Sequence, residues 1–348
     1  MKNNNRLLYI LIVILTIWCV VLTTMVTNNS NTQEQEFNEI VVDGISTDFT
    51  KIINDKKDSL VTINAYGSIG TGFVYKQDGN DIYIVTAYHT LADSTSYYVY
   101  FANGYSVNAE LVGRNIYSDI AVLKLNSPYS VETLDLADVT SSKSGEFIVC
   151  IGTPVSTDYD ASVELGMISN TDRTIENSIT VEDIEIKYYM DVVQLSSNLK
   201  PGFSGSPVIN MNGEVIGMVT MNIQEGFNFA ITSNELKIIV DKIIADEQTT
   251  KYQLGIKGNY VANMPMFERS NLNLSVETID GLYVEKLADS SIALLAGVKT
   301  GDVILSINEQ TLTNINDYLK VVYTQTDAFE FEVLRNDEVS KLVVNIND

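Results

Sequence analysis

Thr86-Ala87-Tyr88-His89-Thr90-Leu91 contains the only histidine in a chain of 348 residues. Two further stretches stand out from it: Ser118-Asp119-Ile120-Ala121-Val122 and, much later, Gly202-Phe203-Ser204-Gly205-Ser206-Pro207. An imidazole, a carboxylate that can orient it and a serine on a glycine-flanked turn are the groups that serine-nucleophile acyl transfer requires. Their order along the chain, His, Asp, Ser, predicts a serine protease.

Each residue type suits one step of that chemistry. The hydroxyl of Ser204 attacks carbonyls poorly unless a base takes its proton, and imidazole is a suitable base because it titrates near neutrality. We therefore expect His89 to be the base and Asp119 to hold one nitrogen of its ring and stabilise the imidazolium. The backbone N–H groups of Gly202 and Ser204 are the predicted oxyanion donors, provided that the turn is tight.

Each stretch also has an ordinary structural interpretation. A Gly-x-Ser-Gly turn occurs in loops of many kinds, and an aspartate before an apolar run is usually a turn residue at the edge of a strand. A single histidine before an apolar residue is usually structural. The occurrence of all three stretches, in this order, favours the enzyme.

The chain from about residue 46 to residue 232 is a succession of short β-type runs separated by Gly, Asn and Asp clusters, which is typical of an all-β barrel or sandwich. Asn234 to Ala245 then changes to helical spacing, with Ser233 as the predicted N-cap. The predicted strands are Leu60–Asn64, Ile82–Thr86, Tyr97–Phe101, Ile120–Leu125, Phe147–Ile151, Val215–Met221 and Phe227–Ile231.

The N-terminal stretch from Leu7 to Val26 has no charge and is long enough to cross about 30 Å of hydrocarbon as a helix. We expect a membrane anchor here. A cleaved signal peptide is the alternative, although its apolar part is usually shorter and no clear cleavage site follows. Lys2 and Arg6 precede the stretch and the next basic residue is Lys51, so the N-terminus is expected in the cytoplasm and the rest outside it.

Charge and cysteine content limit the partners and cofactors. A formal net charge of −23, spread along the chain, argues against nucleic acid and anionic lipid surfaces as partners of the soluble part. Cys19 lies in the apolar N-terminal stretch and Cys150 in an apolar strand, so we expect no disulfide. Cys150 is predicted to be a small core residue, not a nucleophile. With one histidine, no Cys/His metal cluster is possible, and we expect neither a metal nor a cofactor.

The last hundred residues follow a different pattern. Gly281–Glu285 reads as a strand, Ser291–Leu295 as a short helix and Ala296–Asn308 as a turn that leads into a buried strand. A further helix is expected near Asn316 to Tyr323.

Together these features resemble the HtrA (DegP/DegS) family of trypsin-like serine proteases with a C-terminal PDZ domain. Gly70-Thr71-Gly72-Phe73 resembles the family's Gly-Ser-Gly strand, and Gly152-Thr153-Pro154 resembles its Gly-Asn-Pro turn. The resemblance implies a mainly β chain with two packed barrels and a PDZ domain, preceded here by the transmembrane helix. The expected domains are a cytoplasmic tip and anchor (1–27), a flexible linker (28–45), the protease domain (46–248) and the PDZ domain (249–348).

The resemblance also implies partners. PDZ domains bind extended C-terminal peptides at a sheet edge and capture the terminal carboxylate with backbone N–H groups. Tyr252, Leu254, Gly255 and Ile256 resemble the carboxylate-binding loop, although Leu254 and Ile256 could instead be core residues of an edge strand. Unfolded or damaged proteins as substrates and a homotrimer are likewise implied by the family alone.

The chain departs from the family pattern at several positions. Ala87-Tyr88 replaces two asparagines, while Phe203 and Ser206 replace an asparagine and a glycine around the serine. Phe203 could narrow the site or alter the oxyanion turn, which leaves an inactive, membrane-tethered peptide-binding or chaperone-like adaptor as the alternative function. The segment from Asn170 to Lys187 is longer than the common family loop and is predicted to be a solvated insertion or a regulatory loop.

Overall fold

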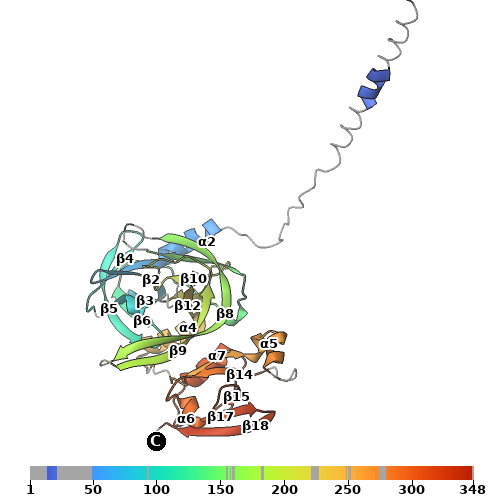
Figure 1. Ribbon diagram of the computed structural model, residues 1–348. Coiled ribbons are helices and arrows are strands. Elements are labelled where there is room, and N and C mark those ends of the chain that lie inside the picture. The colour runs from blue at the N-terminus through green and yellow to red at the C-terminus, as the bar shows by residue number, and fades with distance from the viewer. Residues whose placement is uncertain are drawn as a thin grey trace, which may run out of the picture. The chain divides into compact units, whose positions relative to one another are not determined.

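The structure is a computed structural model of the chain. It describes residues 14–21 and 49–346, apart from gaps at 92–93, 154–155, 157, 159–160, 182–183, 221–226, 248, 250–251, 273 and 275–279. The described residues from 49 to 346 belong to one compact unit, shown with its elements labelled in Figure 1, and residues 14–21 belong to another unit. The predicted boundary between residues 248 and 249 stays a prediction, because it lies inside the larger unit.

The first six strands close into a barrel, which follows a helix α2 (Phe49–Lys56) and a short 3₁₀ turn η1 (Lys57–Ser59). Closure leaves no exposed sheet edge, and alternate side chains fill the interior. The strands pair in the order β1-β2-β3-β6-β5-β4. They are β1 (Leu60–Ala65), β2 (Ser68–Asp78), β3 (Asp81–Ala87), β4 (Tyr97–Phe101), β5 (Ser106–Asn115) and β6 (Ile120–Asn126).

A 3₁₀ turn η2 (Val139–Ser141) precedes the second closed barrel, in which the strands pair in the order β10-β11-β12-β9-β8-β7. Its strands are β7 (Phe147–Gly152), β8 (Ser162–Val181), β9 (Ile184–Leu195), β10 (Pro207–Ile209), β11 (Val215–Val219) and β12 (Asn228–Thr232). The double-barrel expectation is thus confirmed, and each predicted strand corresponds to an observed one. The strand predicted to end at Met221 ends earlier, at Val219, and Met221 itself lies outside the described residues.

Helix α4 (Ser233–Ile244) follows the second barrel and buries Leu236, Ile239 and Val240. The predicted helix is confirmed, but the predicted N-cap is wrong. Thr232 caps the helix, because its extended backbone lets its hydroxyl accept a hydrogen bond from the N–H of Glu235.

The C-terminal part is a sheet with the order β13-β14-β15-β17-β18, and β16 pairs with β15. The strands and helices expected from the sequence are all present. The elements are β13 (Ile256–Tyr260), η4 (Val261–Asn263), α5 (Met266–Asn271), β14 (Leu282–Leu287), α6 (Ile292–Ala296), β15 (Val303–Ile307), β16 (Gln310–Thr311), α7 (Ile315–Val322), β17 (Ala328–Arg335) and β18 (Glu338–Asn345).

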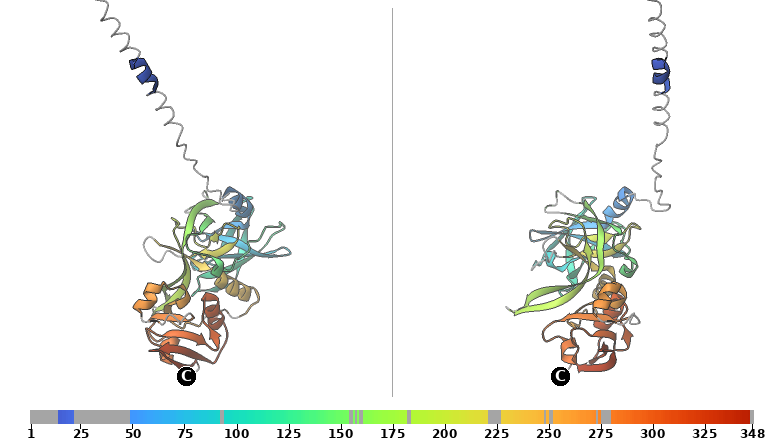
Figure 2. Two further views of the ribbon diagram at one scale, coloured as in Figure 1. Left: turned by 90° about the vertical axis from the view of Figure 1, so that its right-hand side faces the viewer. Right: turned by 45° about the vertical axis from the view of Figure 1, so that its right-hand side comes forward.

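The segment from Asn170 to Lys187 is not a loop. Strands β8 and β9 extend through it as one long antiparallel hairpin, paired from Ile168 with Leu195 to Val181 with Ile184. Figure 2 shows this hairpin in green to yellow as the longest strand pair of the molecule. Alternation of β-branched and polar residues, such as Thr174-Ile175-Glu176, explains the extended structure.

Residues 14–21 of the N-terminal stretch are helical. The remainder of the predicted span from Leu7 to Val26, and the predicted linker, lie outside the described residues. Within the described part of the chain, no helix combines the length and the apolar character that a membrane crossing needs.

Cys150 lies on β7 in the interior of the second barrel and has no exposed surface. Burial raises the pKa of its thiol to about 12. At pH 8 only about one thiol in ten thousand would then be ionised, and the thiolate is the reactive form. In a Cys19→Ser chain, Cys150 should therefore not react with a disulfide reagent at pH 8 until urea unfolds the protein. Stoichiometric labelling of the native protein within minutes would contradict this.

Candidate active site

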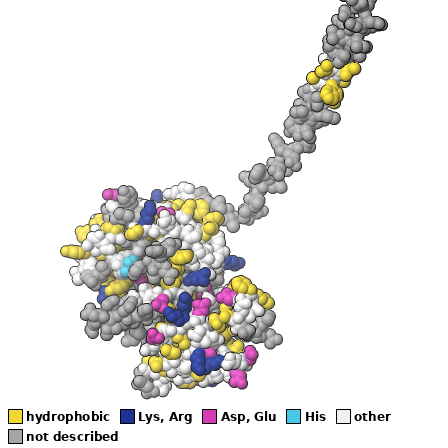
Figure 3. Space-filling view, in the orientation of Figure 1, with side chains coloured by type: hydrophobic (Ala, Val, Ile, Leu, Met, Phe, Trp, Pro, Cys, Tyr) yellow, Lys and Arg dark blue, Asp and Glu magenta, His cyan; other side chains and the backbone are white. Residues whose placement is uncertain are grey.

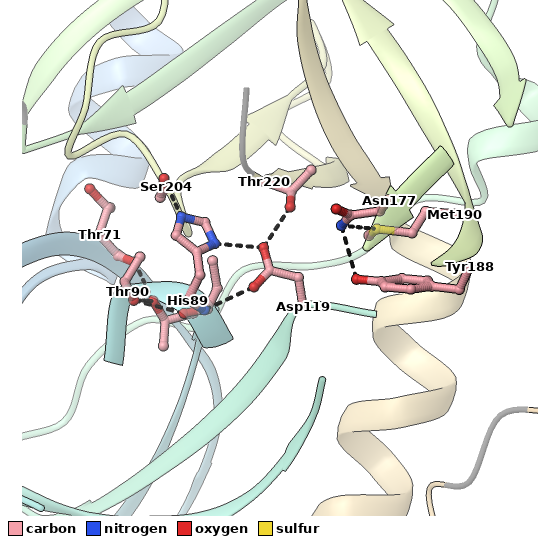
Figure 4. Close-up of polar contacts among 11 residues, drawn as sticks. Thr71, His89, Thr90, Asp119, Asn177, Tyr188, Met190, Ser204 and Thr220 are labelled. Carbon is pink, nitrogen blue, oxygen red and sulfur yellow. Dashed lines mark hydrogen bonds and ion pairs between the residues drawn. The ribbon is translucent and has the colours of Figure 1, made fainter. Parts of the chain in front are cut away.

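Three side chains that are far apart in the sequence meet in one hydrogen-bonded row, drawn in Figure 4. The Nε2 atom of His89 lies 2.8 Å from the Oγ atom of Ser204, and Nδ1 lies 2.8 Å from Oδ2 of Asp119. His89 and Asp119 come from the first barrel, and Ser204 comes from the second. The predicted base, carboxylate and serine are thus brought together with the distances that proton transfer needs.

His89 lies on the one-turn helix α3 (Tyr88–Leu91), directly after β3. Its backbone N–H donates to Oδ1 of Asp119, so the carboxylate holds both the ring and the backbone of the same residue. About a quarter of the imidazole is exposed, and Figure 3 shows the single histidine side chain, in cyan, at the molecular surface. Solvent and substrate can therefore reach the ring.

Asp119 ends a tight turn before β6 and is almost fully buried. Its φ of 51° is left-handed, a conformation that aspartate tolerates better than most residues. The turn is fixed by bonds from the N–H of Tyr88 to the Asp119 carbonyl and from the N–H of Ser118 to Oδ1 of Asn115. Thr220 adds a further bond, since its hydroxyl donates to Oδ2 of Asp119. The sequence did not predict this contact.

Ser204 follows a turn formed by Lys200-Pro201-Gly202-Phe203. The N–H of Phe203 donates to the carbonyl of Lys200 at 3.1 Å, and Gly202 has a φ of 101°. Proline at the second position and a left-handed glycine at the third are typical of a type II turn. Gly205, with a φ of 85°, admits no side chain, because a Cβ atom would lie 2.1 Å from the carbonyl oxygen of Thr71.

The N–H groups of Gly202 and Ser204 donate no hydrogen bond to any other described residue. Gly202 is buried and Ser204 is half-buried. A buried N–H normally has a partner, because leaving it without one is costly. Two such donors beside the Ser204 hydroxyl are therefore available to a developing negative charge.

Phe203 does not narrow the site. Its ring is 1% exposed and packs in the core next to Gly152, where a Cβ atom would lie 2.9 Å from it. The other departures from the family pattern also have packing roles: Ala87 and Ser206 are buried, and the ring of Tyr88 packs against the guanidinium of Arg114.

The four residues predicted to bind a peptide carboxylate lie in the segment that leads into β13, with Ile256 as the first residue of that strand. Gly255 has a φ of 71°, and a Cβ atom there would meet Ser291, so only glycine fits. Leu254 is fully buried and Ile256 is 4% exposed, so their side chains pack in the core, while carboxylate binding by the backbone of this segment stays a prediction. The N–H of Tyr252 donates to the carbonyl of Val322 at the end of α7.

The face between β13 and α7 is covered by the long hairpin. Thr174 on β8 and Asp191 on β9 share a cavity of about 10 Å³ with Ile256, Gly258 and Tyr318. No peptide side chain fits in so small a space. At the exposed side of this contact, Lys286 pairs with Glu176 of the hairpin at 2.9 Å.

Two family models match the chain: "Trypsin-like peptidase domain" over residues 70–218 and "PDZ domain" over residues 242–323. A curated relative, the serine protease Do-like HtrA of Lactococcus lactis subsp. lactis, is 30% identical over 301 residues, which are 80% of this chain and 73% of that protein. The protein of the same description from Lactobacillus helveticus is 29% identical over 306 residues, 84% of this chain and 72% of that protein.

A solved structure of the HtrA-type protease AlgW with a tripeptide has a TM-score of 0.59 and 24% identity, and covers 85% of this chain and 95% of that one. Two closed barrels followed by a PDZ domain, with a serine, a histidine and an aspartate in contact, define a trypsin-like serine protease. The chain belongs to the HtrA family of serine proteases.

Replacement of Thr220 by valine should lower kcat about 10-fold. The substitution removes the hydroxyl that donates to Asp119, and one hydrogen bond to a charged group contributes about 1.5 kcal/mol. Thr174→Val is the matched control, since that hydroxyl also donates to an aspartate, Asp191, but outside the site. Equal kcat values for the two variants would contradict the assignment.

Proposed function

We propose that the chain is an endopeptidase in which Ser204 is the nucleophile, His89 the general base and acid, and Asp119 the group that orients the imidazole. The observation that carries the proposal is the continuous row from Asp119 through His89 to Ser204, with 2.8 Å at each step. As Ser204 Oγ attacks the scissile carbonyl, its proton passes to Nε2 of His89. The imidazolium then returns that proton to the leaving amine, and a water molecule repeats the sequence on the acyl-enzyme.

The N–H groups of Gly202 and Ser204, which donate to none of the described residues, are the proposed oxyanion donors. The carbonyl oxygen of the substrate gains a full negative charge in the tetrahedral intermediate, so donors fixed in advance stabilise this state more than the substrate. The Lys200–Phe203 turn supports this role, because its hydrogen bond and the left-handed Gly202 fix the backbone that carries both donors.

We further propose that unfolded or damaged proteins are the substrates and that the PDZ domain binds their C-termini, or those of other proteins. The AlgW structures, one with a tripeptide and one with a decapeptide, support the peptide-binding part by fold alone. The hairpin over β13 and α7 implies that a peptide binds only after this contact opens. Peptide binding and the position of the hairpin are then linked equilibria.

Membrane anchoring through Leu7 to Val26, an extracytoplasmic location of the protease and PDZ domains, and a homotrimer complete the proposal. The uncharged stretch and the basic residues before it support the first two, and the family supports the third. Protease digestion of intact cells or spheroplasts tests the location, because only an external domain is degraded.

The adaptor alternative rests on Phe203 and the residues before His89, which have packing roles in the structure. Ser204→Ala should abolish cleavage of reduced casein by the full chain in detergent, while its thermal unfolding stays unchanged. A Ser204→Ala protein that keeps its function in cells would favour the adaptor, whereas one that still cleaves casein would exclude Ser204 as the nucleophile.

Cleavage by the unmodified chain should be lost in acid, because a protonated imidazole cannot accept the proton of Ser204. The measurement is kcat/KM for one peptide between pH 4 and pH 9. A rate that is constant down to pH 4 would exclude His89 as the base.

Lys286→Glu should raise the affinity for hydrophobic C-terminal peptides, by about two- to fivefold at low salt. The variant places like charges at the Lys286–Glu176 contact and so weakens the closed arrangement. Lys341→Glu is the matched control, since Lys341 pairs with Glu330 inside the PDZ domain. Fluorescence anisotropy of a labelled peptide gives both affinities, and equal values would contradict the proposed closure.

A further inference from the structure

The carbonyl oxygens of Gly202 and Ser204, whose N–H groups are the two proposed oxyanion donors, both accept hydrogen bonds from Thr71 of the first barrel. The Thr71 hydroxyl donates to the Gly202 carbonyl at 2.8 Å, and the Thr71 N–H donates to the Ser204 carbonyl at 3.0 Å. These bonds fix the peptide planes before and after the plane that contains the Ser204 N–H. The plane that contains the Gly202 carbonyl is also joined to the Gly202 N–H through the φ and ψ angles of Gly202, so fixing it helps to fix the direction of that second donor.

The remaining polar groups of Thr71 are used as well. Its hydroxyl oxygen accepts from the N–H of Thr153 at 2.9 Å, and its carbonyl accepts from the hydroxyl of Thr86 at 2.7 Å. Thr71 is 1% exposed. With both a donor and an acceptor on its hydroxyl satisfied, the side chain has one orientation that keeps every bond.

The flanking glycines explain why the strand comes so close to the site. A Cβ atom at Gly70 would lie 2.8 Å from the side chain of Thr90, the residue after His89. At Gly72 it would lie 2.8 Å from the side chains of Ile63 and Ile84. The two glycines therefore let β2 pack closely against α3 and against its neighbours β1 and β3, and Thr71 between them contacts the second barrel.

We propose that Thr71 is a positioning residue that holds the Gly202 and Ser204 N–H groups in the arrangement that stabilises the oxyanion. This inference rests on the proposed function, since it assigns a role within the same site. Thr71 is buried and bonds to the turn that carries the oxyanion donors. Those donors stabilise the transition state more than the bound substrate, so the substitution should act on the transition state. Loss of its hydroxyl should lower kcat and leave KM nearly unchanged.

The test compares Thr71→Val, Thr71→Ser and Thr62→Val in the full chain. Valine keeps the shape of threonine but cannot bond to Gly202, whereas serine keeps the hydroxyl. Thr62 is the matched control, because it is buried, pairs with Thr71 across β1 and β2, and bonds to the hydroxyl of Thr153 and not to the turn. Activity is measured with one quenched fluorescent peptide.

Thr71→Val should lose about 10- to 100-fold in kcat with less than a threefold change in KM, below the loss expected for removing an oxyanion donor outright. The kcat of Thr71→Ser should be within about threefold of that of the unmodified chain, and the kcat of Thr62→Val should be within about twofold of it. Affinity for a peptide aldehyde, which forms a hemiacetal with Ser204, should fall in parallel with kcat. The acid limb of the pH profile should not move.

A Thr71→Val protein with unchanged kcat, or a Thr71→Ser protein as slow as Thr71→Val, would overturn the inference while Ser204→Ala remains inactive and the proposed function stands. Cleavage that survives Ser204→Ala would overturn both. If Thr71→Val does not fold, Thr71→Ala takes its place with the same expected result.

Discussion

The contact between β2 of the first barrel and the serine turn of the second is the constraint on which the rest of the site depends. Each barrel is a closed sheet, yet the base and the serine come from different barrels. A 2.8 Å hydrogen bond between them requires the two bodies to meet with little freedom. Thr71 supplies two of the bonds at this contact, and Gly205 lets the backbones approach.

A buried carboxylate, that of Glu235, connects the PDZ domain to the turn that holds Asp119. Oε1 of Glu235 on α4 accepts hydrogen bonds from the hydroxyl of Ser118, at 2.6 Å, and from that of Tyr323, at 2.7 Å. Burial, reinforced by Glu235, raises the pKa of Tyr323 well above its usual value, so the phenol remains a donor. Ser118 directly precedes Asp119, and Tyr323 directly follows α7. A shift of α7 would therefore displace the Tyr323–Glu235–Ser118 hydrogen bonds and with them the turn that carries Asp119.

The sequence predicted the three residues that meet in the site and seven strands of the two barrels, but it predicted a loop where β8 and β9 form their hairpin. His89, Asp119 and Ser204 could be predicted because few combinations of residues perform acyl transfer, and short alternating runs predict strands wherever one face is buried. Thr220, directly after β11, and the role of Thr71 on β2 could not be found, because neither threonine has a local signal for a partner more than a hundred residues away. The capping of α4 by Thr232 depends on one backbone angle, and hydroxyl residues at 232 and 233 fit the pattern equally well.

The central claim is that the Asp119–His89 pair activates the hydroxyl of Ser204, and covalent labelling tests it most directly. The full chain would be treated with a fluorophosphonate, which reacts with activated serines, and the modified residue would be located by mass spectrometry. The account predicts one adduct, on Ser204, that forms much more slowly in His89→Ala. Labelling at another serine, or equal labelling of Ser204 in the His89→Ala protein, would contradict it.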